Sequence, residues 1–163
     1  MSLLDLDAML GQSLSATEAA PDFITPENGT YVLVVKDTKA SKKDVKDKAA
    51  AIKEGKPTEY VSLEFTYAVD SVVEQEGHPI KPGSMFMERF TFTEQGLPYF
   101  KARVRDIAVA SGGSEDDADS LSIKEALEAV KGIKFTTVIK LSKRTVNGNE
   151  MINVRLNNIS AAE

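Results

Sequence analysis

The order of the predicted elements constrains this chain more than any other feature of its sequence. Three strand-like runs come first, at 30–35, 59–69 and 84–93, a helical stretch follows at 96–111, and two more strand-like runs lie at 133–141 and 152–159. Alternating polarity over the run at 59–69 is typical of a half-buried strand, and aromatic and β-branched residues dominate the run at 30–35. The chain therefore reads β-β-β-α-β-β.

This order predicts a mainly β fold with α (α+β), namely a five-stranded OB-type Greek-key barrel with its helical insertion between strands 3 and 4. Residues 29–160 form the predicted barrel domain, and residues 1–28 form an acidic N-terminal arm or linker that is rich in Ser, Ala, Thr and Pro over much of its length. The lysine-rich stretch at 36–56 becomes a long loop between strands 1 and 2, with a helical piece at 46–53. A short helix is predicted from the capping-box spacing at Ser122 to Gly132, and the stretch at 114–120 is predicted to be an acidic loop.

Composition excludes several classes of protein. The 163 residues contain no cysteine, which removes disulfides and thiolate chemistry, and no apolar run reaches the length of a membrane span. The N-terminus carries acids where a secretion signal carries bases. We therefore expect a cytoplasmic protein with no membrane partner, and a homo-oligomer is left open.

Catalysis has little support in the sequence. His78 is the sole histidine and sits in a Gly-His-Pro turn, so triads, Cys–His dyads and most zinc sites are excluded. The acids at 114–120 lack the spacing of an EF-hand and are expected to be solvated. We expect no enzyme, no cofactor and no metal site.

Charge is segregated along the chain although the net charge is -5. Residues 36–56 carry eight lysines against four acids, and residues 131–163 carry six bases against two acids, whereas residues 1–28 carry five acids and no base. In OB-type barrels the ligand contacts the face of strands 2 and 3 and the loops between strands 1 and 2 and strands 4 and 5. The basic excess falls in those two loops, 36–56 and 143–149, which favours a polyanionic ligand.

Single-stranded nucleic acid is the polyanion that this pattern fits best, because it needs a basic groove and aromatic faces for base stacking. Tyr60 is the aromatic expected outside the core, whereas Tyr31, Phe86, Phe90 and Phe92 are expected inside unless the faces are reversed. The predicted nucleic-acid-binding residues are Lys39, Lys42, Lys43, Lys46, Tyr60, Arg89, Lys134, Lys140, Lys143, Arg144 and Arg155.

Over residues 26–160 the chain resembles the small OB-fold single-stranded-DNA-binding proteins of tailed bacteriophages. The resemblance rests on Pro26-Glu27-Asn28-Gly29-Thr30-Tyr31, the lysine-rich loop, a helix running into Ala108-Val109-Ala110-Ser111-Gly112, and the closing pattern from Gly132 through Asn147-Gly148 to Ile159. It implies sequence-independent binding and protection of single-stranded DNA during phage replication or recombination in the host cytoplasm. The chain departs from the resemblance in ending Ser160-Ala161-Ala162-Glu163 in place of an acidic tail, so replication or recombination proteins would have to be recruited by the acidic N-terminal arm.

Two other functions remain open from the sequence. The acidic total favours a non-catalytic phage structural module, or one that binds a host factor. A metal-dependent nuclease that uses the acidic residues is the weakest of the three hypotheses.

Overall fold

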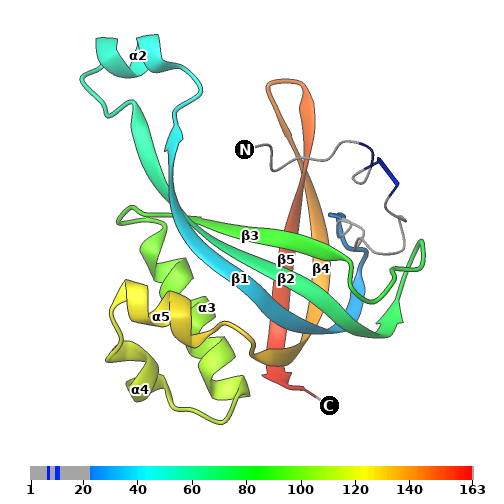
Figure 1. Cartoon of the computed structure of the whole chain (residues 1–163). Helices are drawn as coiled ribbons and strands as arrows, with labels where there is room; N and C mark the ends of the chain where they lie inside the picture. Colours follow the sequence, from blue (N-terminus) through cyan, green and yellow to red (C-terminus); the bar gives the residue numbers. More distant parts are fainter. Residues whose placement is uncertain (1–6, 8–9, 12–22, 163) are drawn as a thin grey trace.

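The computed structural model describes residues 7, 10–11 and 23–162. It shows a curved sheet with the helices of residues 97–129 gathered on one side, and a further short helix at the tip of the hairpin formed by the first two strands (Figure 1). The strands are β1 (Gly29–Asp44), β2 (Glu59–Gln75), β3 (Met85–Thr91), β4 (Lys134–Val146) and β5 (Asn149–Ala161). The helices are α2 (Lys48–Lys53), α3 (Leu97–Ala110), α4 (Glu115–Asp119) and α5 (Ile123–Ala129). The fold is thus mainly β with a few helices, in the predicted order of strands.

The five strands form one antiparallel sheet in the order β3-β2-β1-β4-β5. The predicted OB-type Greek-key barrel is not confirmed, because the sheet is open and β3 and β5 are its two edges. Side chains from α3 occupy the space near these edges, and one of them, Arg103, contacts both edge strands. The Arg103 side chain therefore links the two edges at one point, in place of strand pairing.

The first two strands are longer than predicted. They pair in antiparallel fashion along their whole length, from Gly29 opposite Gln75 to Asp44 opposite Glu59. Three register shifts interrupt the regular pairing. The predicted loop at 36–56 is therefore wrong over 36–44, which belongs to β1. The backbone N–H and C=O groups of this polar stretch are hydrogen-bonded through its pairing with β2, so it forms a strand although it has no apolar face. Only 45–58, including α2, connects the two strands.

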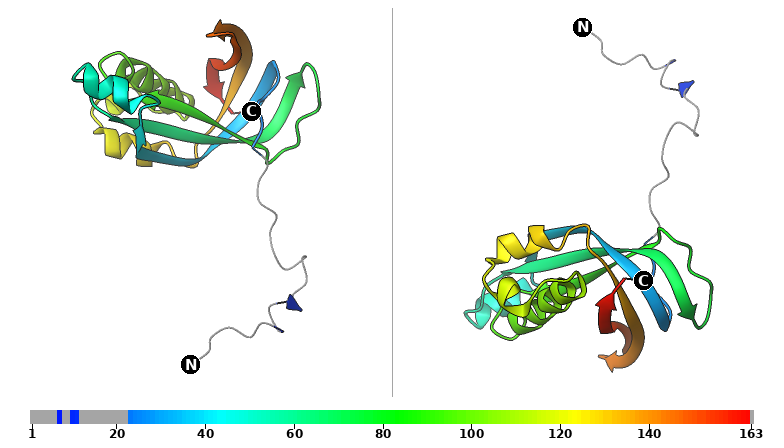
Figure 2. Two further views of the ribbon diagram at one scale, coloured as in Figure 1. Left: turned by 90° about the horizontal axis from the view of Figure 1, so that it is seen from above. Right: turned by 90° about the horizontal axis from the view of Figure 1, so that it is seen from below.

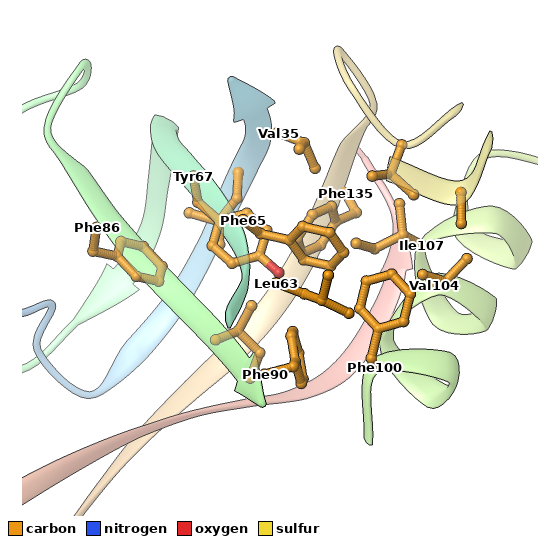
Figure 3. Close-up of a cluster of buried hydrophobic side chains, with 14 of the residues drawn as sticks. Val35, Leu63, Phe65, Tyr67, Phe86, Phe90, Phe100, Val104, Ile107 and Phe135 are labelled. Carbon is orange, nitrogen blue, oxygen red and sulfur yellow. The ribbon is translucent and has the colours of Figure 1, made fainter. Parts of the chain in front are cut away.

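Aromatic side chains dominate the hydrophobic core between the sheet and α3 (Figure 3). Phe65 of β2, Phe90 of β3 and Phe100 of α3 form a cluster with ring centroids 5.6 to 5.8 Å apart, and Val104 and Ile107 of α3 are buried beside it. Edge-to-face and tilted ring pairs of this kind add to the stabilisation that apolar burial provides. The core thereby fixes α3 against the sheet.

The helices between β3 and β4 follow the sequence signals closely. Pro98 lies in the first turn of α3, and the Ser122–Glu125 capping box begins α5 as predicted. The acidic stretch predicted as a loop is instead the short helix α4, because the Ser114 hydroxyl accepts a hydrogen bond from Asp117 N and its acids occupy the first turn.

The chain before β1 contacts the sheet at β3, where Ile24 N donates to Met85 O at 2.9 Å. Most of the predicted arm lies outside the described residues, so the division into an arm and a domain remains a prediction. Among the residues that the structure describes, no helix is long and apolar enough to cross a membrane.

Candidate nucleic-acid interface

Three of the predicted cations converge on a single buried carboxylate. Glu64 is 1% exposed, and its Oε1 lies 3.3 Å from Lys43 Nζ and 3.7 Å from Arg89 Nε. Its Oε2 lies 3.7 Å from Lys39 Nζ. Ser41 also donates to Oε1 at 3.3 Å. We call Lys39, Lys43, Glu64 and Arg89 the outer-face cluster.

Strand register explains why these side chains meet. Lys39 on β1 lies directly opposite Glu64 on β2, and Glu64 lies directly opposite Arg89 on β3. Side chains directly opposite each other in antiparallel strands share a face, so the three form one row across the sheet. Two rows away, Lys43 lies opposite Tyr60 on the same face. The core side chains Leu63 and Phe65 flank Glu64 in the sequence and point to the other face.

The electrostatics keep Glu64 ionised. Burial alone would raise the pKa of this carboxyl, but the hydrogen bond and charge of Lys43, with the charges of Lys39 and Arg89, outweigh it and lower the pKa. One carboxylate is not enough to neutralise three cations. The outer-face cluster therefore presents net positive charge, and its cationic side chains are 39% to 61% exposed.

A second pair of predicted cations lies on β4 and β5. Lys140 and Arg155 face each other directly across these strands, and both are exposed. Further along the same ladder, Arg144 lies opposite Met151. Lys134 is placed differently, because its Nζ lies 3.2 Å from Asp70 Oδ1.

The remaining predicted lysines lie near the ends of the two long hairpins. Lys42 lies on the opposite face of β1 from Lys39 and Lys43, because successive side chains of a strand point to opposite faces. Its partner on β2 is Val61. Lys46 is exposed in the bend before α2, and Lys143 lies 3.4 Å from Glu150 across the β4–β5 hairpin. Both hairpins project from the same end of the sheet, yet their tips stand apart (Figure 2). The cations expected in loops are thus mostly strand residues, and alternation divides them between faces.

Aromatic side chains follow the sequence expectation in part. Tyr60 is 40% exposed beside Lys43, whereas Tyr31, Phe86 and Phe90 are buried in the core. Phe92 is 46% exposed, since it follows the last residue of β3 beyond the core. Tyr99 on α3 is 72% exposed, more than any of these rings, and was not among the predicted binding residues.

A cleft of about 810 Å³ lies between the two edge strands, with α3 along its side. Its lining includes Arg89 from β3, Tyr99 and Arg103 from α3, and Arg155 from β5. Arg89 therefore belongs both to the outer-face cluster and to this cleft, which we call the seam cleft.

A semi-buried ion pair crosses the seam cleft. Arg103 Nε and Nη2 donate to the two oxygens of Glu88 at 2.8 and 2.9 Å, and Arg103 Nη1 donates to Leu156 O of β5 at 3.4 Å. The Tyr67 hydroxyl donates to Glu88 Oε1 at 2.6 Å, and burial, with the adjacent Glu88 carboxylate, raises the pKa of Tyr67. The bidentate geometry orients the guanidinium and ties β3 to β5 through α3.

Glu64, Arg103 and Tyr99 were missed as functional residues, although the sequence holds a signal for two of them. Glu88 shares its strand face with Phe86 and Phe90, and a charged group on a core face requires a partner. Arg103 is the partner of Glu88, and it lies on α3 next to the buried Val104. Glu64 is an acid in the middle of the alternating run at 59–69, which pairs with the lysine-rich part of β1, whereas Tyr99 carries no comparable signal.

Within the described part of the chain, no group of three or more His, Asp or Glu side chains is arranged to hold a metal ion. Of the acids of α4, Asp119 contacts basic side chains, since Arg105 Nε and Nη2 donate to its two carboxylate oxygens at 2.7 and 2.5 Å. No protein-family model matches the chain, and no curated protein matches it either. Function is therefore inferred from the arrangement of the residues themselves.

Proposed function

We propose that this protein binds single-stranded DNA without sequence preference and protects it, as a non-enzymatic component of phage replication or recombination. The observation that carries the proposal is the outer-face cluster, in which Lys39, Lys43 and Arg89 gather around Glu64. Such a cluster supplies the phosphate contacts that sequence-independent binding requires.

The buried carboxylate gives the cluster its shape. Free lysines lose conformational entropy when they bind phosphate, whereas Lys39 and Lys43 already lie over one fixed oxygen pair. A phosphate that binds above the cluster competes with Glu64 for these cations and does not have to order them. Preorganisation of this kind favours affinity without any contact to a base edge.

Base stacking is assigned to Tyr60. Its ring is exposed on the same face, directly opposite Lys43, so a phosphate at Lys43 brings the adjoining base within reach of the ring. Stacking tolerates every base because each has a π-face. Together, the Lys43 cation and the Tyr60 ring can hold one nucleotide by its phosphate and its base.

The strand order also fits the proposal. An OB-type barrel is partly open and binds oligonucleotides on the face of strands 2 and 3. We assign this chain to that type as an open variant, with the order β3-β2-β1-β4-β5 and a seam between β3 and β5. The outer-face cluster lies on β1, β2 and β3, which includes the face that such barrels use.

A titration of fluorescein-labelled oligo-dT at two salt concentrations tests the proposal. We expect micromolar or tighter binding that weakens steeply as salt rises, because counterions are released from the DNA. The Lys43→Gln and Lys42→Gln variants form a matched pair, since both remove one charge from neighbouring positions on opposite faces of β1. Lys43→Gln is expected to weaken binding several-fold and Lys42→Gln to change it little. Absence of binding by the wild type at low salt would refute the proposal.

A further inference from the structure

The two groups of cations on the sheet lie at opposite ends of its strand order. The outer-face cluster lies on β1, β2 and β3, and the pair of Lys140 and Arg155 lies on β4 and β5. The curvature of the sheet nevertheless brings its edges to opposite sides of one cleft, because residues of β3 and β5 line it together. Arg89 lines one side of the seam cleft, and Arg155 lines the other.

The strand edges in the seam cleft have backbone groups that point toward it. Phe92 N donates to Val61 O and Val69 N donates to Ser84 O, so the even-numbered residues of β3 bond to β2. In an antiparallel ladder the alternate residues direct their N–H and C=O groups away from the partner strand, and in β3 these include Met87 and Arg89. On β5 the Leu156 carbonyl faces the cleft, since it accepts from Arg103. Backbone N–H groups that point away from the partner strand can donate to the phosphate oxygens of a bound nucleic acid.

The cleft also carries an aromatic face. Tyr99 is 72% exposed on α3 and lies in the lining together with Arg89 and Arg155. The acids of the lining are Glu88, which is bound by Arg103, and Asp106, which lies 3.8 Å from Arg103 Nη1. Arg89 and Arg155 thus take no part in the ion pair between Arg103 and Glu88. An exposed ring and two cations in one cleft are the groups that a nucleotide base and its flanking phosphates require.

Resting on the proposed function, we infer that the bound strand leaves the outer-face cluster at Arg89 and crosses the seam cleft. One base stacks on Tyr99 there, and the following phosphate reaches Arg155 and Lys140. This path joins the two groups of cations into a single track over the open edge of the sheet. It also gives the open edge a role, since pairing of β3 with β5 would close the cleft.

Oligo-dT titrations of three variants test the path. Tyr99→Leu is expected to lower affinity by about 5-fold or more with an unchanged salt slope, because only stacking is lost, and Tyr99→Phe should restore the affinity. Arg155→Gln is expected to lower affinity and to reduce the salt slope by about 0.7, as loss of one phosphate contact requires. Lys124→Gln on α5, whose side chain lines neither site, is the charge-matched control and should leave both quantities near wild type.

The outcomes separate this inference from the proposed function. If Lys43→Gln weakens binding while Tyr99→Leu and Arg155→Gln bind like wild type, DNA stays on the outer face and the path is wrong. If the wild type does not bind at low salt, the function and the path both fail. Circular dichroism spectra that match the wild type confirm that each variant is folded, as expected for these exposed positions.

Discussion

At the scale of single residues, the molecule holds two carboxylates on its sheet in different ways. Glu64 lies on the outer face beneath three exposed cations, and Glu88 lies on the inner face against one oriented guanidinium. Removal of a partner from a buried charge is costly because the remaining charge is left desolvated. Both carboxylates should therefore affect stability, and only Glu64 should also affect the outer-face cluster.

Glu64→Gln is predicted to destabilise the folded chain at pH 7 by about 1 to 3 kcal/mol, because three cations lose their counter-charge. The Glu64 carboxyl has a lowered pKa in the fold, so its ionised form stabilises the fold above its ordinary pKa of 4.5. That stabilisation is lost as pH falls through the lowered pKa. Urea unfolding at several pH values should show the gap between wild type and variant narrowing below about pH 4.5. A gap that stays constant to pH 3 would contradict the assignment.

Arg103→Met is predicted to cost about 3 kcal/mol, since it leaves Glu88 without its cation in a largely buried position. The matched control is Arg105→Met on the same helix, which removes an exposed pair with Asp119 and should cost much less. Chemical denaturation of the two variants gives the comparison. Adding Glu88→Gln to Arg103→Met should recover part of the loss, and no recovery would show that the guanidinium acts by packing alone.

At the scale of elements, the sequence predicted the existence of each strand better than its ends. The run at 59–69 alternates clearly and forms the first part of β2, but the apolar alternation ends where the core ends and does not reach Gln75. The polar stretch of β1 after Val35 extends beyond the core and is held by its pairing with β2, which no periodicity of its own reveals. Lys39, Lys42 and Lys43 were therefore identified as candidate cations but wrongly assigned to a loop.

Ser122→Ala is predicted to destabilise the protein by about 1 kcal/mol, because it removes the capping box at the start of α5. Helix α5 contributes Ala126 to the core, so fraying of its first turn should be transmitted to the whole domain. Thermal unfolding followed by circular dichroism measures the loss. Lys124→Ala, in the same turn without a capping role, should leave the melting temperature unchanged, and an equal loss in both variants would rule out capping as the cause.

Gly148→Ala is predicted to weaken the β4–β5 hairpin by about 1 kcal/mol. Asn147 and Gly148 have φ of 52° and 80°, and only the glycine adopts this conformation without strain. An added Cβ meets no atom within 4 Å, so strain alone is responsible. Amide hydrogen exchange should accelerate near the hairpin tip, whereas Asn147→Gly should not accelerate it.

At the scale of the whole molecule, the arrangement depends on contacts between elements that lie far apart in the sequence. The sequence predicted the order of the elements along the chain. It did not predict that Arg103 of α3 would link the two sheet edges through Glu88 of β3 and Leu156 of β5. The outer-face cluster likewise depends on the register of three strands, which a single sequence does not specify. Tyr99 is a candidate because α3 lies beside the seam cleft, and a single sequence does not specify that packing.

The central claim is that local positive charge on the outer face binds single-stranded DNA although the net charge is -5. The most direct test compares two triple variants that each remove three positive charges. One is Lys39→Gln, Lys43→Gln and Arg89→Gln, and the other is Lys56→Gln, Lys101→Gln and Lys124→Gln. We measure the dependence of oligo-dT affinity on salt for both and for the wild type. The first triple is predicted to reduce the salt slope by about 2, as the loss of three phosphate contacts requires, and the second to leave it unchanged. Equal slopes in the two triples would contradict the claim, because net charge rather than the outer-face cluster would then control binding.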